Sequence, residues 1–368
     1  MSPAWLGRLV EICRPPTGVD ALLRAWLADD RTAADAWGDF ERRADLDHLP
    51  GPEMCLVGLV SKRLPTIAPT SMLRGRVGGI ERANWSRAQL AVGEAAAAAD
   101  VLTTQDIPVL IVGNAARCAT GDAIGRGRRI DRVDCCVRPA DIPRAHDLLL
   151  ADGWQFAAPH AVARSRAQSA HACRFVRGRF GALEVRKSPF PHPVPDAIAA
   201  VAVWQRAKPG TLGDASVLLP SATDALAITV ADGMRRSCYT GLWLADVAMA
   251  TGDGIDWQLF EEESGRQGLD AAAFYSLLYV NDRLARAVPK ETLGRLERSA
   301  ARRSVRTAIL LAEYRCGARA SGMSRSVAGI VQRLRRFVSR QPASASLDTG
   351  HEHRKDWRGR TVSRNHGH

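Results

Sequence analysis

The chain has 368 residues, of which 46% are hydrophobic, and it carries a formal net charge of +12. At about 150 residues per domain, this length allows a large core and two or so structural units. The sequence contains no run of about 18 apolar residues, and its N-terminal residues lack a signal-peptide pattern. These features exclude fibrous and membrane-spanning classes and predict a cytoplasmic globular protein without a transmembrane segment.

The positive charge is concentrated toward the C-terminus. Residues 301–368 hold fifteen of the 51 Lys and Arg residues but only four of the 39 Asp and Glu residues. The rest of the chain is therefore almost neutral. Residues 323–340 have the spacing of an amphipathic helix, and residues 341–368 are polar and aperiodic, which predicts a disordered basic tail. Such a tail favours weak binding to nucleic acid or to an anionic membrane surface.

The first third of the chain has a helical pattern. Apolar residues recur at helical spacing over residues 19–40, 45–63 and 82–104. We therefore expect an N-terminal helical region that spans residues 1–104.

The period then changes to that of an α/β unit. Residues 107–112 and 130–137 read as short β-branched strands, and residues 140–152 read as a helix. The stretch "ACRFVRGRFGALEVRK" follows as two strands of a hairpin. These elements predict an α/β core over residues 105–195.

Helical spacing returns after a proline-rich loop. We expect a C-terminal helical region over residues 196–340, with helices at residues 221–235, 241–251, 257–267, 271–287 and 291–319.

The eight cysteines include no C-x-x-C pair, which is the usual spacing of metal and redox sites. Cys135 and Cys136 are adjacent, so on a strand they point to opposite faces. We interpret the cysteines as reduced thiols packed in the core.

Acidic residues on two of the predicted strands form the candidate chemical site. Asp134 lies in "RRIDRVDCCV" and Glu184 in "GALEVRK". A site for phosphoryl transfer by two metal ions needs two or three carboxylates that bridge Mg²⁺. Because side chains at positions i and i+2 of a strand share a face, Asp131 is one residue too early and reaches Asp134 only through a β-bulge.

The order of several motifs carries a resemblance. The stretches "IVGNAA", "RRIDRVDCCV", "LEVRK", "LWLADVAM" and "IDWQLF" occur in the order typical of the bacterial uncharacterised nucleotidyltransferase family, within the polymerase-β superfamily. The resemblance implies an α+β fold, in which a small polymerase-β-type mixed sheet is flanked by N- and C-terminal helical regions. It also implies transfer of a nucleotidyl group from an NTP substrate to an unspecified acceptor, with Mg²⁺ as cofactor.

The same resemblance assigns the site residues. It implies that Asp134 and Glu184 are catalytic residues and metal ligands, with Asp131 as a further candidate ligand. It implies nucleotide-binding positions at Gly113, Asn114 and Arg128.

The sequence departs from the family pattern at charged positions. Arg132 stands where the family has its first metal-binding aspartate, and Arg186 stands where the family has a histidine. Gly113 and Asn114 replace a lysine and a glycine. Two arginines beside the acidic pair repel a divalent cation, which argues against an active site. Two interpretations therefore stay open. The protein is either an active transferase or a catalytically inactive binding or assembly module. Binding through the basic tail is a third.

Any nucleic-acid or anionic-lipid binding should depend on residues 323–368 and should weaken steeply with salt, because it would rest on exchange of counterions. Binding to DNA and to anionic vesicles, measured between low and moderate salt with and without these residues, checks this. Binding that ignores both salt and truncation would contradict it.

Overall fold

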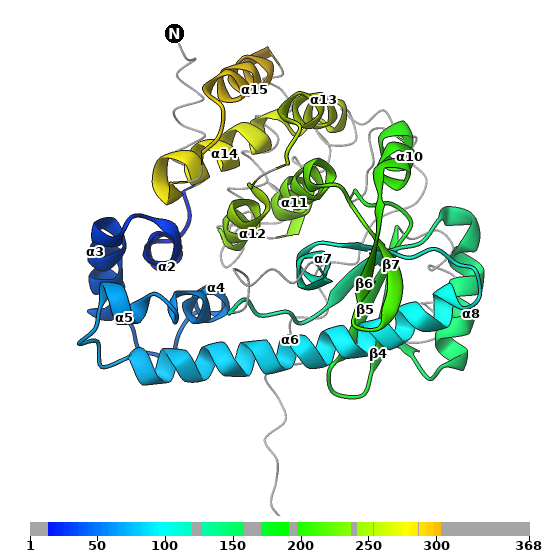
Figure 1. Ribbon diagram of the computed structural model, residues 1–368, viewed down its shortest axis with the longest axis horizontal. Helices are drawn as coiled ribbons and strands as arrows, with labels where there is room; N and C mark the ends of the chain where they lie inside the picture. The colour runs from blue at the N-terminus through cyan, green and yellow to red at the C-terminus, as the bar shows by residue number, and fades with distance from the viewer. Residues whose placement is uncertain are drawn as a thin grey trace, which may run out of the picture.

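The computed structural model describes residues 14–119, 127–157, 171–190, 197–236, 241–252, 254–285 and 287–302. Most of the basic segment, including the predicted helix at 323–340 and the tail at 341–368, lies outside these ranges. The architecture is α+β, as the sequence predicts, with one mixed sheet and helical regions before and after it in the chain (Figure 1). None of the described helices combines the length and the apolar composition needed to cross a membrane.

The sheet has seven strands in the order β3-β4-β5-β2-β1-β7-β6. β2 lies near its centre, antiparallel to β1 and parallel to β5, and this places the candidate acidic strands side by side. The strands are β1 (Leu110–Val112), β2 (Val133–Cys136), β3 (Gln155–Phe156), β4 (Ala172–Arg177), β5 (Gly181–Arg186), β6 (Lys208–Leu212) and β7 (Ala215–Leu219).

The predicted hairpin is present as β4 and β5, which pair antiparallel from Ala172↔Arg186 to Arg177↔Gly181. The hairpin formed by β6 and β7 is an addition that the sequence analysis did not assign. It follows helix α10 (Ala197–Arg206), and β7 pairs parallel with β1, so the sheet includes residues beyond 195.

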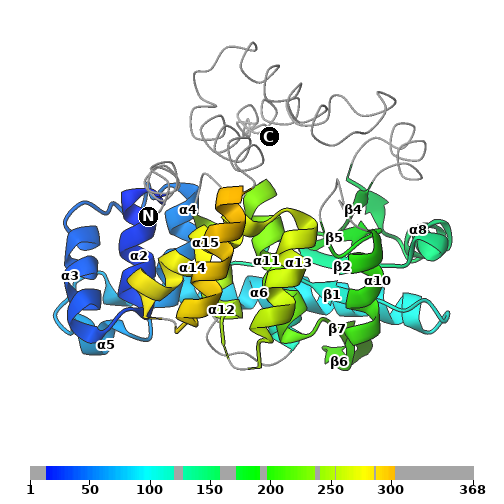
Figure 2. The same ribbon diagram turned by 90° about the horizontal axis from the view of Figure 1, so that it is seen from above.

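The N-terminal helices pack together at one end of the molecule (Figure 2). The single helical run expected over residues 19–40 is two helices, because Asp29 caps the second one by accepting a hydrogen bond from the Thr32 amide (3.0 Å). The elements are α2 (Thr17–Leu27), α3 (Asp30–Glu41), α4 (Gly51–Leu56), the 3₁₀ turn η1 (Val57–Val60) and α5 (Leu64–Ile67).

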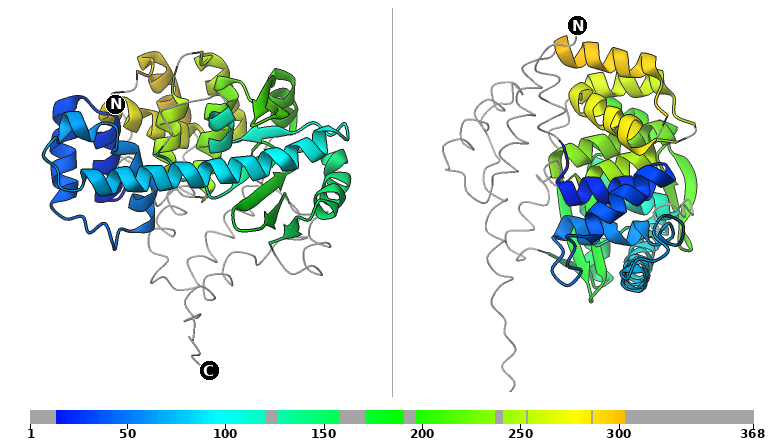
Figure 3. Two further views of the ribbon diagram at one scale, coloured as in Figure 1. Left: turned by 60° about the horizontal axis from the view of Figure 1, so that its bottom comes forward. Right: turned by 90° about the vertical axis from the view of Figure 1, so that its left-hand side faces the viewer.

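Helix α6 (Arg74–Thr103) runs the length of the molecule, from the N-terminal helices to the sheet (Figures 1 and 3). It begins earlier than the predicted residue 82. Near its start Val77 belongs to the core of the helical regions, whereas its alanine-rich last turns and Leu102 pack under the sheet.

The remaining helices follow the prediction closely. The helix expected at 140–152 is η3 (Pro139–Asp141) and α8 (Ile142–Ala151). The C-terminal region holds α11 (Ala222–Arg236), α12 (Leu242–Ala250), α13 (Trp257–Gln267), α14 (Asp270–Leu284) and α15 (Lys290–Arg302). Residues 303–319 of the helix predicted at 291–319 lie outside the described residues. Helix α7 (Asn114–Ala119) follows β1.

Two hydrophobic cores lie on opposite faces of the sheet. Val133 and Cys135 of β2 belong to the core shared with α6 and α8, and Cys136 belongs to the core shared with the helical regions. Residues alternate between faces along a strand. Asp134 therefore points toward the helical regions, and the adjacent cysteines lie on opposite faces, as predicted.

Gly127 should contribute to the stability of the fold because its position leaves no room for a side chain. A Cβ atom at this position would lie 2.4 Å from the backbone of Gly58 in η1, while the Asn84 side chain donates a hydrogen bond to the Gly127 carbonyl (3.1 Å). Because backbone atoms cannot give way, Gly127→Ala should reduce the free energy of unfolding by about 1–3 kcal/mol. Urea unfolding checks this.

The matched control is Gly79→Ala in α6, where an added Cβ meets nothing within 4 Å. Since alanine favours helix over glycine, this variant should gain about 0.5–1 kcal/mol. Equal effects of both variants would contradict the assigned role of Gly127.

Candidate functional site

The sheet brings the two predicted acidic residues directly together. Asp134 on β2 is the register partner of Glu184 on the parallel strand β5. Arg132 lies two residues before Asp134, and Arg186 lies two residues after Glu184, so all four side chains belong to one face of the sheet. That face lies toward α11, from which Asp232 contacts Arg186.

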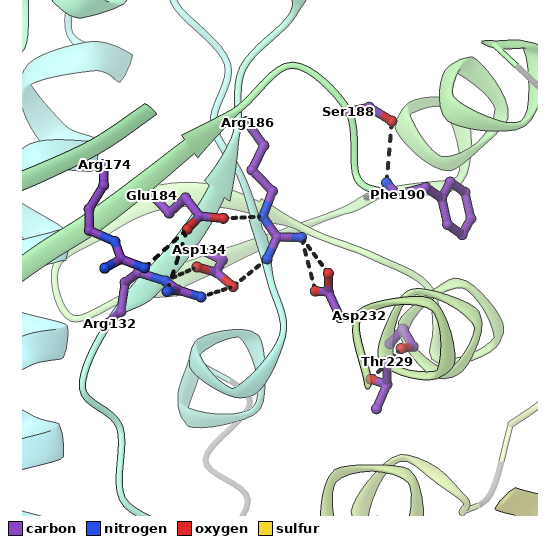
Figure 4. Close-up of polar contacts among 10 residues, drawn as sticks. Arg132, Asp134, Arg174, Glu184, Arg186, Ser188, Phe190, Thr229 and Asp232 are labelled. Carbon is purple, nitrogen blue, oxygen red and sulfur yellow. Dashed lines mark hydrogen bonds and ion pairs between the residues drawn. The ribbon is translucent and has the colours of Figure 1, made fainter. Parts of the chain in front are cut away.

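These four residues form a closed ring of alternating charge, here called the arginine–carboxylate ring (Figure 4). Arg132 Nε donates to Asp134 Oδ1 (2.7 Å), and Arg132 Nη1 lies 3.4 Å from Glu184 Oε2. Arg186 Nη2 donates to Asp134 Oδ2, and Arg186 Nε lies 3.3 Å from Glu184 Oε1. Each guanidinium group therefore bridges both carboxylates, one from each side.

Arg186 also ties the ring to the helical region. Its Nη1 donates to both carboxylate oxygens of Asp232 on α11 (3.0 and 2.9 Å), and its side chain is 0% exposed. Helix α11 approaches α12 closely at the next residue, because Gly233 leaves the space that the Trp243 side chain fills. The sequence analysis did not identify Asp232, since a single aspartate in a helix carries no motif.

The two ring arginines differ in burial. Arg132 keeps 24% of its side chain exposed and forms the open side of the ring, together with the half-exposed Arg174 on β4, whose Nη2 lies 3.8 Å from Glu184. Burial opposes the charge of Arg186, but Asp232 and Asp134 outweigh it and raise its pKa. Burial likewise opposes the charge of Arg132, and Asp134 outweighs it to raise the pKa. Both guanidinium groups are therefore permanently charged.

A comparison with known protein families gives a match for this chain. Residues 54–285, more than half of the chain, match the family described as uncharacterised nucleotidyltransferase. The chain belongs to this family. No curated protein and no solved structure matches it.

The family resemblance implies a Mg²⁺ ion, but the residues of the ring do not fit one. A Mg²⁺ site needs carboxylate oxygens that are available to the ion. Here both oxygens of Asp134 and both oxygens of Glu184 contact guanidinium nitrogens, and Arg132 bridges the two carboxylates. Across the described residues, no group of three or more His, Cys, Asp or Glu is arranged to hold a metal.

Asp131, the further candidate ligand, lies before β2 and outside the ring. Its side chain is 54% exposed and accepts from Arg129 Nε (2.7 and 2.8 Å), and Arg87 lies 3.7 Å away. Arg129 thus pairs on the surface with an aspartate two residues later. Arg132 pairs with Asp134 at the same spacing inside the ring.

The predicted nucleotide-binding residues lie in two places, and the turn at Gly113 is the one that borders the ring. Gly113 and Asn114 form the turn from β1 into α7, and Gly113 has a φ of +69°. A Cβ atom on Gly113 would lie 3.9 Å from Asp134 Oδ2, so this turn borders the ring. Nucleotide binding by this turn stays a prediction.

Arg128, the third predicted nucleotide-binding residue, is buried and contacts a helix. Its Nε and Nη2 donate to Asp246 on α12 (3.1 and 3.3 Å), and although burial opposes its charge, Asp246 raises its pKa. This ion pair fixes the start of the segment that leads into β2. The spacing of 118 residues gives sequence analysis no means of detecting it.

The thiols of Cys135 and Cys136, which flank the ring on β2, are free and buried. Burial raises the pKa of Cys135 to about 12 and raises that of Cys136 as well. Both thiols stay protonated near neutral pH, which makes them unreactive core residues rather than nucleophiles.

Arg186→Met should destabilise the protein strongly. Removing one partner of a buried ion pair leaves the other charges without compensation, which costs about 3–5 kcal/mol. Urea unfolding measures the loss. The control Arg42→Ala removes the exposed pair with Asp39 and should leave the stability nearly unchanged. A small effect of Arg186→Met would contradict a structural role for the ring.

Proposed function

We propose that this nucleotidyltransferase-family protein does not catalyse Mg²⁺-dependent nucleotidyl transfer, and that it acts as a binding or assembly module. The observation that carries this proposal is the contact of Arg132 with both Asp134 and Glu184. A guanidinium group occupies the space that a metal ion would need, and its charge repels such an ion.

The chemistry of transfer supports the same conclusion. In metal-dependent transfer, the ion neutralises phosphate charge and activates the attacking oxygen. Arginine supplies positive charge but stays protonated, so it cannot accept the proton of an acceptor hydroxyl. If Asp134 accepted that proton, Arg132 and Arg186 would face a neutral carboxyl group, and the charge balance of the ring would be lost.

The alternative is an active enzyme in which a rearranged segment brings Asp131 into the site. The exposed contacts of Asp131 with Arg129 and Arg87 argue against it, because these contacts hold the carboxylate outside the ring. The two functions predict opposite behaviour of the natural protein toward Mg²⁺-NTP, so they can be separated directly.

Isothermal titration calorimetry should detect no Mg²⁺-dependent NTP binding by the natural protein. Arg132→Asp should gain such binding, because it restores two carboxylates at positions i and i+2 on the ring face. Since Arg186 still contacts Asp134, Arg132→Asp combined with Arg186→His should bind more tightly, provided that circular dichroism shows it to be folded.

The control for the alternative is Asp131→Asn. If the natural protein binds Mg²⁺-NTP and this variant abolishes the binding, then Asp131 is a ligand and the proposal is wrong. Binding by the natural protein that none of these substitutions changes would place the nucleotide elsewhere and would also contradict it.

A further inference from the structure

We infer that Arg132 is a tethered counter-cation, which supplies from the chain itself the positive charge that the Asp134 and Glu184 pair requires. This inference deepens the proposed function, because it assigns the role of Arg132 within the same site. It concerns the ring in the absence of any nucleotide.

The geometry distinguishes the two ring arginines. Arg186 is completely buried and is shared with Asp232, so it is part of the connection between the sheet and α11. Arg132 is partly exposed, and it forms ion pairs with the two ring carboxylates, Asp134 and Glu184. A substitution of Arg132 therefore removes a guanidinium group on the solvent side of the ring and leaves the contact of Arg186 with Asp232 on α11 in place.

The two carboxylates need a cation at this place for an electrostatic reason. Asp134 and Glu184 are direct register neighbours on adjacent strands, and their side chains are only 14% and 10% exposed. Like charges directly opposite each other destabilise a sheet, and low exposure strengthens their repulsion. With Arg132 in place, the carboxylates of Asp134, Glu184 and Asp232 face three guanidinium groups, those of Arg132, Arg186 and the half-exposed Arg174. Without Arg132, three carboxylates face two guanidinium groups, and one negative charge is in excess.

The inference therefore predicts that a free cation can take the place of the Arg132 guanidinium group once this group is removed. In Arg132→Ala, the space beside Asp134 Oδ1 and Glu184 Oε2 opens to solvent, and a small divalent cation can enter it. Calcium is a suitable probe because it accepts irregular oxygen geometry. The natural protein should not respond, because its own guanidinium group already occupies the place.

The experiment is thermal unfolding in calcium chloride and in sodium chloride of equal ionic strength, without nucleotide. At about ten times the dissociation constant, calcium should raise the melting temperature of Arg132→Ala by about 3 °C more than sodium chloride does. The natural protein and Arg132→Lys, which keeps the charge, should show no such difference. Adding Glu184→Gln to Arg132→Ala should abolish the calcium effect.

Arg129→Ala is the matched control, since Arg129 also pairs with an aspartate two residues later but lies outside the ring. A calcium effect in Arg132→Ala no larger than in Arg129→Ala would overturn the inference. If Arg132→Ala is folded only with calcium present, the inference is supported. If it does not fold in either salt, Arg132→Gln is judged by the same criterion, and failure of both variants to fold would show that the arginine shape is required and would also overturn it.

The two ideas fail separately. Mg²⁺-NTP binding by the natural protein would refute the proposed function without touching the calcium result. An absent calcium response would refute the tethered cation and would leave the proposed function standing.

Discussion

The arrangement of the sheet and the helical region depends on the ion pairs of the buried Arg186 guanidinium group. This group joins β5, on which it lies, to Asp134 on β2 and to Asp232 on α11. A buried positive charge is tolerated only when carboxylates compensate it with good geometry. Asp134 and Asp232 are therefore required by the packing of Arg186, whether or not the protein performs any chemistry.

This requirement separates family membership from catalysis. The family assignment rests on the match over residues 54–285, and the candidate site rests on the paired carboxylates Asp134 and Glu184. In this chain the same carboxylates compensate Arg132 and Arg186. Asp134 and Glu184 thus have a structural role as counter-ions of two arginines, and their presence alone does not indicate a functioning enzyme.

Sequence patterns predicted the strands that carry the site, and residue alternation placed Asp134 on the face opposite Cys135. The pairing of Asp134 with Glu184 followed from the family resemblance, since register between strands about 50 residues apart is set by the whole sheet. The ion pairs of Arg128 with Asp246 and of Arg186 with Asp232 were not predictable, because they join elements by tertiary packing. The β6–β7 hairpin did leave a signal, a Gly213-Asp214 turn followed by the mostly apolar stretch "ASVLL", with Gly213 at a φ of +58°.

The length of α6 has a consequence for how the protein unfolds. At 1.5 Å per residue, its 30 residues span about 45 Å. Near its start, Val77 belongs to the core of the helical regions, and its residues from Val92 to Leu102 contribute to the core beneath the sheet. If one core unfolds, the part of α6 that belongs to it loses its packing, and this weakens the helix on which the other core depends. This single rigid element couples the two cores energetically, so they are expected to melt in one cooperative transition rather than as independent units.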